Sequence, residues 1–325
     1  MTFRPLPLLG NPHVQTILGS LWKGPGVKLP SRLHTVALAD GDALAAHETT
    51  PLDWKSGQPI VVLVHGLGGS HRSAMVQRLA NAFNAHGMKV IRVDLRGAGA
   101  GVGLARRVYN AASAEDVRAT SEFFCHQSPS SPLFLVGLSL GANIVLNLAG
   151  SAATKPLAGL KAVAALSPPV DLVMCSAMLA TLPFYDHYYA RNLRRQVRKH
   201  EACHPDVARA AFPKNLTMRQ FDEIYTAPRG GFADAMDYYH RASSLPVIPQ
   251  IEVPTFILSA RDDPFIAVPP LERLGGHSNL QIMLVSKGGH LGFLGHDGQG
   301  GLRWAERRMV EWVISQTALP DGRGS

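Results

Sequence analysis

Cysteine is scarce in this sequence, which contains only Cys125, Cys175 and Cys203. An odd number of cysteines without a C-x-x-C pair predicts neither a disulfide framework nor a zinc site. We therefore expect three free thiols, which suit the reducing conditions of a cytoplasm.

Long apolar runs are also absent. None approaches the roughly 20 residues that a membrane-spanning helix requires. Prolines and Asn11 interrupt the N-terminal stretch, where a signal peptide needs an unbroken apolar core. With 46% hydrophobic and 17% charged residues, the composition is typical of a folded globular chain. We expect a cytoplasmic protein that is at most peripheral to a membrane.

The net charge of +8 identifies no partner by itself. Because no nucleic-acid-binding motif accompanies it, we expect no nucleic acid partner. The glycine-rich segment His65–Gly69 lacks both the G-x-G-x-x-G spacing of a dinucleotide site and the lysine of a P-loop. The sequence therefore predicts no cofactor and no metal ion.

The segment Ser131–Gly150 carries the most informative pattern in the chain. Its apolar run Leu133–Val136 predicts a buried strand, and Ala142–Ala149 predicts a helix. Between them, residues 137–141 form a G-x-S-x-G motif with Ser139 at its centre. A turn this tight needs glycine two residues before and after the serine, and it lifts the hydroxyl above the edge of the sheet. Ser139 is therefore the candidate nucleophile.

Strands and helices alternate around this motif, which predicts a mostly parallel sheet covered by helices. Strands are expected at Ile60–Val64, Lys89–Val93, Lys161–Leu166, Thr255–Ala260 and Leu280–Val285, helices at His71–His86, Ser113–His126 and Leu302–Ser315, and an antiparallel hairpin at Arg32–Ala39 and Ala43–Thr49. Ser113 with Asp116 three residues later resembles a capping box, so we expect Ser113 to cap its helix.

The alternation stops between residues 171 and 250, where aromatic-rich helical pieces replace the strands. We predict an N-terminal arm at residues 1–30, the first part of an α/β core at 31–170, a helical cap insertion at 171–250 and a second core part at 251–325. Within the irregular, proline-rich arm, Asn11–Leu18 is the most structured stretch.

A serine hydroxyl needs a base to take its proton as it attacks. His290 follows the last predicted strand in a glycine-rich loop, which makes it the candidate base. Asp262 and Asp263 follow the strand before that at the same edge of the sheet, and either could orient the histidine. We favour Asp263, because the position before Pro264 is held extended.

The predicted oxyanion hole consists of the backbone N–H groups of Leu67 and Leu140. Leu140 begins the helix after the serine, and Leu67 lies in the loop after the first buried strand. We expect His65, in the same loop, to make structural hydrogen bonds rather than act as a second base.

The serial order of HGLGG, DLRGAG, GLSLGAN, DDPF and GGHLGF resembles the α/β-hydrolase superfamily. The longer strings NPHVQTIL, DEIYTAPRGGFADAMDYYH and IEVPTFILSARDDPF are similar to its YheT-like branch, whose eukaryotic relatives include medium-chain ester hydrolases and synthases and phospholipases. The resemblance spans the chain from Asn11 to Trp312. It implies an α/β-hydrolase fold in which Ser139 is the nucleophile, His290 the base and one aspartate of the DDPF pair the orienting acid.

These patterns predict a serine esterase that cleaves short- to medium-chain or lipid-like carboxylic esters through an acyl-enzyme. Transfer of the acyl group to an alcohol shares every step except the last and is the first alternative. A non-catalytic binding protein that keeps the fold is the second. A haloalkane dehalogenase would need an aspartate in place of Ser139. The sequence does not predict the natural substrate or the oligomeric state.

The segment Arg191–His200 is unusually basic. Such a run usually forms a solvated helix face, but it can also form a rim that steers anionic or lipid-interfacial substrates and contacts a membrane. The aromatic residues of the predicted cap are expected in its core, with one or two lining an acyl site. They are Phe184, Tyr185, Tyr188, Tyr189, Tyr238 and Tyr239.

Overall fold

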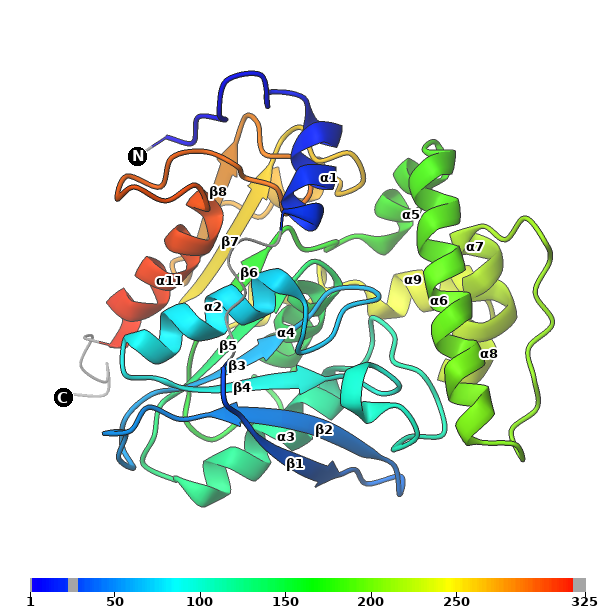
Figure 1. Cartoon of the computed structure of the whole chain (residues 1–325), viewed down its shortest axis with the longest axis horizontal. Coiled ribbons are helices and arrows are strands. Elements are labelled where there is room, and N and C mark those ends of the chain that lie inside the picture. The colour runs from blue at the N-terminus through cyan, green and yellow to red at the C-terminus, as the bar shows by residue number, and fades with distance from the viewer. Residues whose placement is uncertain (1, 23–28, 318–325) are drawn as a thin grey trace.

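The centre of the molecule is one twisted sheet (Figure 1). The computed structural model describes residues 2–22 and 29–317, so Met1 and residues 23–28 of the predicted arm and residues 318–325 of the second core part lie outside the described residues. Within the described part, eight strands follow the order β1-β2-β4-β3-β5-β6-β7-β8. They are β1 (Arg32–Ala37), β2 (Ala43–Thr49), β3 (Ile60–Val64), β4 (Lys89–Asp94), β5 (Leu133–Leu138), β6 (Leu160–Leu166), β7 (Thr255–Ala260) and β8 (Leu280–Val285).

The pairing of the strands confirms the expected hairpin and parallel sheet. β1 pairs antiparallel with β2, and β2 pairs antiparallel with β4. All other neighbours are parallel. Every residue of β3 and β5 is buried, because their apolar side chains point alternately into hydrophobic clusters on both faces. The carboxyl ends of β3, β5 and β7 therefore meet at one edge of the sheet.

Helices cover both faces, as Figure 1 shows. On one face lie α3 (Ala114–Gln127) and α4 (Leu140–Ser151), and on the other α2 (Ala74–Ala85) and α11 (Trp304–Thr317). The short helices η1 (Gly99–Gly101) and α10 (Pro269–Glu272) follow β4 and β7.

The predicted cap of α3 is wrong in its chemistry. Ser113 occupies the N-cap position, but its side chain makes no capping bond and accepts a hydrogen bond from the Asn110 backbone instead. Asp116 binds the guanidinium of Arg96 through two hydrogen bonds of 2.8 Å. Two parallel bonds between a guanidinium and a carboxylate add both energy and geometric specificity, so Asp116 faces Arg96.

The chain between β6 and β7 is helical and lies to one side of the sheet (Figure 1). It contains α5 (Leu172–Ala180), α6 (Pro183–Cys203), α7 (Met218–Phe221), the π-helical turn η2 (Asp222–Thr226), α8 (Ala227–Gly230), α9 (Ala235–Ala242) and η3 (Ile248–Gln250). The exact bounds of the four predicted parts stay a prediction. Among the described helices, none is both long and apolar enough to cross a bilayer.

The most structured stretch of the predicted arm is a helix, α1 (Pro12–Leu21). The side chain of Asn11 accepts hydrogen bonds from the backbone N–H groups of His13 and Val14, and Pro12 is the first helical residue. Both residue types favour helix starts, since asparagine satisfies free N–H groups and proline has none to lose.

Candidate active site

Ser139 lies at a strained turn between β5 and α4. Its backbone has φ 51° and ψ −120°, a conformation that L-residues rarely adopt. A Cβ on Gly137 would come within 2.5 Å of Ala142 Cα, and a Cβ on Gly141 within 2.8 Å of the carbonyl carbon of Val64. Both positions therefore require glycine, which is the steric basis of the G-x-S-x-G pattern.

His290 and Asp263 form a hydrogen-bonded row with Ser139. His290 Nε2 lies 2.9 Å from Ser139 Oγ, and His290 Nδ1 lies 2.8 Å from Asp263 Oδ2. An ionised carboxylate only accepts hydrogen bonds, so Nδ1 carries the imidazole proton and Nε2 is free to accept from the serine hydroxyl. Both His290 and Asp263 are buried.

Asp262 and Asp263 have different partners. Asp263 Oδ1 accepts hydrogen bonds from the backbone N–H groups of Phe265 and Ile266, each at 3.1 Å, which fix the carboxylate. Asp262 instead accepts a 2.9 Å hydrogen bond from the backbone N–H of Gly289. Burial, together with the neighbouring Asp263 charge, raises the pKa of Asp262. Of the two carboxylates, Asp263 is the one that contacts the imidazole.

The two predicted oxyanion residues border the cavity in which Ser139 lies. Leu140 is the first residue of α4, so its N–H has no acceptor within the helix. Leu67 follows Gly66, where a Cβ would come within 3.1 Å of Ser139 Cβ, so the loop passes close to the serine.

His65 has the structural surroundings that the sequence suggests. Its Nδ1 lies 2.8 Å from the Gly66 carbonyl, and its Nε2 accepts a 3.3 Å hydrogen bond from the Leu95 N–H. Burial lowers the pKa of His65 and favours the neutral ring. Both ring nitrogens are used to hold the loop.

The row opens into a cavity of about 400 Å³ between the sheet and the inserted helices. Most of its wall is apolar, and four of the six aromatic residues predicted for the cap line it: Tyr188, Tyr189, Tyr238 and Tyr239. Of these, Tyr188 is also exposed to solvent. Tyr185 is buried outside the cavity wall, and Phe184 is exposed. The cavity lies within the range of small-molecule sites, about 300–1,000 Å³.

Comparison with known proteins identifies the fold family. A family model described as alpha/beta hydrolase fold matches residues 59–297, most of the chain. The chain belongs to the α/β-hydrolase family. The strained serine after β5, the histidine after β8 and the acid after β7 lie at the positions that this fold uses for its nucleophile, base and acid.

Curated relatives confirm the resemblance to the YheT-like branch of the α/β-hydrolase family. The putative esterase YheT of Escherichia coli is 28% identical to this chain over 96% of it and 93% of the relative. Medium-chain fatty acid ethyl ester synthase/esterase 2 of Saccharomyces cerevisiae is 28% identical over 78% of this chain and 61% of its own length. Monoacylglycerol lipase of the same yeast is 26% identical over 81% and 60%.

Solved α/β hydrolases agree in fold. The 2,6-dihydroxy-pseudo-oxynicotine hydrolase matches 94% of this chain and 72% of its own with a TM-score of 0.60 and 16% identity. The Pyrococcus furiosus esterase Pf2001 matches 97% of this chain and 98% of its own, with a TM-score of 0.60 and 13% identity.

The α1 helix holds the His290 loop, a role that sequence reasoning missed. Thr16 Oγ1 accepts a 2.9 Å hydrogen bond from the His290 backbone N–H and donates to the Pro12 carbonyl at 2.7 Å. Gln15 bonds both the N–H and the C=O of Leu294. The available signal was the NPHVQTIL string, in which Gln15 and Thr16 stand between apolar residues inside an arm that looks irregular.

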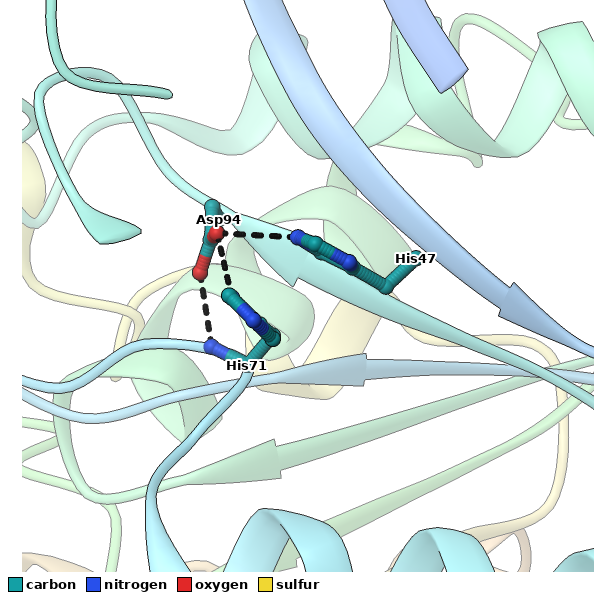
Figure 2. Close-up of side chains that lie close together, drawn as sticks. All are labelled: His47, His71 and Asp94. Atoms are coloured by element: carbon teal, nitrogen blue, oxygen red, sulfur yellow. Dashed lines mark hydrogen bonds and ion pairs between the residues drawn. The ribbon is translucent and has the colours of Figure 1, made fainter. Parts of the chain in front are cut away.

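A second cluster that the sequence did not reveal contains His47, His71 and Asp94 (Figure 2). Asp94 Oδ2 lies 2.6 Å from His71 Nδ1 and 3.2 Å from His47 Nε2. The backbone N–H groups of His71 and Ala100 also donate to this carboxylate. Although burial alone raises it, these hydrogen bonds hold the pKa of Asp94 below its usual range.

The geometry of this cluster does not suit a metal ion. The two imidazoles are stacked with centroids 3.5 Å apart and an interplanar angle of 18°. A ligating nitrogen directs its lone pair in the plane of its ring. Because the two ring planes are nearly parallel, a single metal ion cannot lie in both planes at once. The four hydrogen bonds to Asp94 also fill its acceptor sites. The cluster braces the loop that carries Leu67 against β2 and β4.

Proposed function

We propose that the protein is a serine carboxyl-ester hydrolase. The observation that carries this proposal is the row of hydrogen bonds from Ser139 through His290 to Asp263, at the wall of an apolar cavity. The names of the relatives, which include an esterase and a monoacylglycerol lipase, support ester hydrolysis in general.

In the proposed mechanism, Ser139 Oγ attacks the ester carbonyl while His290 Nε2 takes the hydroxyl proton. Asp263 keeps the Nδ1 proton in place and stabilises the imidazolium that forms. The N–H groups of Leu67 and Leu140 hold the negative oxygen of the tetrahedral intermediate. His290 then protonates the departing alcohol and later activates the water that cleaves the acyl-enzyme.

Short- to medium-chain or lipid-like esters are the proposed substrates, because the cavity wall near the serine consists mostly of apolar side chains. Acyl transfer to an alcohol is the alternative function. One observation favours it, because a yeast relative is named both synthase and esterase. A binding protein without activity would have no need for the strained serine, which costs about 1–3 kcal/mol.

Fluorophosphonate labelling tests the proposal. We expect the wild type and the exposed control variant Ser130→Ala to label, and Ser139→Ala to remain unlabelled. A p-nitrophenyl ester series of increasing chain length then measures the acyl preference, and added ethanol reveals transfer as ethyl ester. A folded wild type that neither labels nor hydrolyses any ester would overturn the proposal.

The two aspartates supply a second test of the proposed mechanism. Asp263→Asn should lower kcat by up to about 10⁴-fold, because the amide no longer favours the tautomer with a proton on Nδ1. Asp262→Asn should cost far less, since Asp262 accepts hydrogen bonds from backbone N–H groups such as that of Gly289, whereas Asp263 is the carboxylate on His290 Nδ1. Steady-state kinetics of both variants decide the assignment. A larger loss in Asp262→Asn would reverse the roles.

We also propose that α6 brings the protein to an anionic membrane surface from a cytoplasmic location. Phe184, Tyr188, Arg191 and Arg195 recur at helical spacing, and all four are exposed. Aromatic and basic groups on one helix face suit the interface between headgroups and acyl chains. Arg198 of the basic segment pairs with Glu201 at 2.7 Å and contributes less free charge.

A further inference from the structure

The inserted helices contribute a buried carboxyl group to the cavity wall. The proposed mechanism does not use this group. Asp222 lines the same cavity as Ser139 and His290, and only 6% of its surface is exposed. It begins the π-helical turn η2, a rare geometry that often occurs at functional sites. Burial raises the pKa of Asp222 to about 6, so the group is mainly ionised at neutral pH.

Hydroxyl groups are the hydrogen-bonding partners of this carboxylate. Thr226 Oγ1 donates to Asp222 Oδ1 at 2.7 Å, and Tyr239 Oη donates to Asp222 Oδ2 at 2.8 Å. In the described part of the chain, no cationic side chain forms an ion pair with Asp222. A carboxylate has about four acceptor sites, so two remain for a further donor.

Thr226, Tyr239 and Ser176 line the cavity together with Asp222. They form a polar patch in a wall that is otherwise mainly apolar. We propose that this patch binds a hydroxyl group on the alcohol part of the ester, with Asp222 as the acceptor. The proposal rests on the proposed esterase function and adds a preference for hydroxylated alcohols to it.

A hydroxyl group fits this patch better than an ammonium group. Arg229 lines the same cavity and would repel a cation. Burying an ammonium group beside Asp222 would also require the desolvation of a second charge, whereas a hydroxyl group carries no such cost. A hydroxyl donates one hydrogen bond to the carboxylate and can accept another from a neighbouring hydroxyl.

Two octanoate esters that differ only in hydroxyl groups test the proposal. They are 1-octanoylglycerol and propyl octanoate. We expect the wild type to prefer the glyceryl ester in kcat/KM by about tenfold or more, the effect of one hydrogen bond to a charged group. Asp222→Asn should remove most of this preference, mainly through KM. The control Asp234→Asn alters an exposed helix cap that asparagine fills equally well, and should keep it.

The outcomes separate recognition from a structural role. If Asp222→Asn lowers kcat/KM for both esters by the same factor, Asp222 only supports the fold and the proposal is wrong. A preference for octanoylcholine that disappears in Asp222→Asn would replace the hydroxyl site with a cation site.

Binding to the Ser139→Ala variant distinguishes failure of this proposal from failure of the esterase function, because it needs no turnover. Calorimetry should give a lower Kd for 1-octanoylglycerol than for propyl octanoate, and the difference should vanish in Ser139→Ala/Asp222→Asn. Equal Kd values for the two esters in Ser139→Ala would overturn the hydroxyl site even if wild-type esterase activity is present.

Discussion

Three buried or half-buried carboxyl groups around the site differ in what surrounds each oxygen. Asp263 receives two backbone N–H groups and an imidazole, and Asp262 receives the Gly289 N–H. From the residues that the structure describes, Asp222 receives two hydroxyl groups. Burial raises the pKa of Asp222 to about 6, because two neutral donors do not offset the loss of water.

This raised pKa predicts that ionisation of Asp222 destabilises the fold. The folded chain holds the proton more tightly than the unfolded chain, whose carboxyl has the ordinary pKa of 3.8. The contribution of Asp222 is therefore fully present below pH 3.8 and is lost as the pH rises to about 6. The loss amounts to about 3 kcal/mol, from roughly two pKa units.

Urea unfolding of the wild type and Asp222→Asn between pH 4 and pH 7 measures this difference. The variant should gain stability relative to the wild type as the pH rises, because asparagine does not titrate. Asp186, Thr226, Tyr238 and Tyr239 surround the group, and none of them is changed. A stability difference that is constant with pH would contradict the prediction. The exposed Asp234→Asn serves as the control.

At the scale of single residues, the sequence predicted the groups that later meet, because each follows a recognisable strand. Ser139, His290 and Asp263 all lie at one edge of the sheet, and strand order alone brings them there. Asp222 could not be recognised, because a sequence does not show that this carboxyl group is buried and that no cation among the described residues pairs with it. The pairing of Asp116 with Arg96 was missed because a partner 20 residues away leaves no local pattern in the sequence.

Among the elements, α1 is the one whose importance the sequence concealed. Its helical start was readable from Asn11 and Pro12, but the proline-rich surroundings favoured an irregular arm. Its packing is unusually close. A Cβ on Gly289 would come within 2.3 Å of the Pro12 carbonyl, and one on Gly292 within 2.5 Å of the Gln15 carbonyl. The glycines near His290 therefore allow α1 to approach the loop.

Loss of the Thr16 hydroxyl should impair catalysis through His290. Thr16→Val keeps the shape but leaves the buried His290 N–H without an acceptor, which costs about 1–3 kcal/mol. We expect kcat to fall about tenfold or more with little change in KM, because a displaced imidazole affects the reaction rather than binding. Steady-state kinetics and the rate of fluorophosphonate labelling measure this effect.

Thr16→Ser should restore most of the activity, since it returns the hydroxyl. Thr154→Val, at an exposed position far from the His290 loop, is the matched control for loss of a threonine hydroxyl. If Thr16→Val melts at a lower temperature but keeps the wild-type kcat, the contact stabilises the fold without positioning the base.

For the whole molecule, the net charge of +8 indicates a binding surface only where basic residues gather on one exposed face. The basic segment was predicted as a solvated face, with a membrane rim as the alternative. The structure separates its residues, since Leu193 and Val197 are buried while Arg191 and Arg195 are exposed on the side that also carries Phe184 and Tyr188. Sequence could not select between the two interpretations, because the exposed aromatics were expected in the core of the cap.

Removal of two charges from α6 should weaken binding to anionic vesicles. Each arginine near such a surface contributes about 1 kcal/mol, so Arg191→Gln/Arg195→Gln should bind about thirtyfold less tightly. Sedimentation with phosphatidylserine vesicles at low and physiological salt measures this change. The control Lys55→Gln/Arg273→Gln removes equal charge from exposed positions outside α6 and should bind as the wild type does. Equal binding of both double variants would sink the membrane proposal.

The bond between Thr16 and His290 joins residues that are 274 positions apart. During synthesis on the ribosome, α1 emerges long before its partner loop, and Ser139 emerges while its base is still to be made. A nascent chain can thus form the strained serine turn without yet having an activated nucleophile. In the proposed mechanism, reactivity towards esters therefore requires the last strand and its loop to return to α1, and we expect the unfinished chain to be chemically inert.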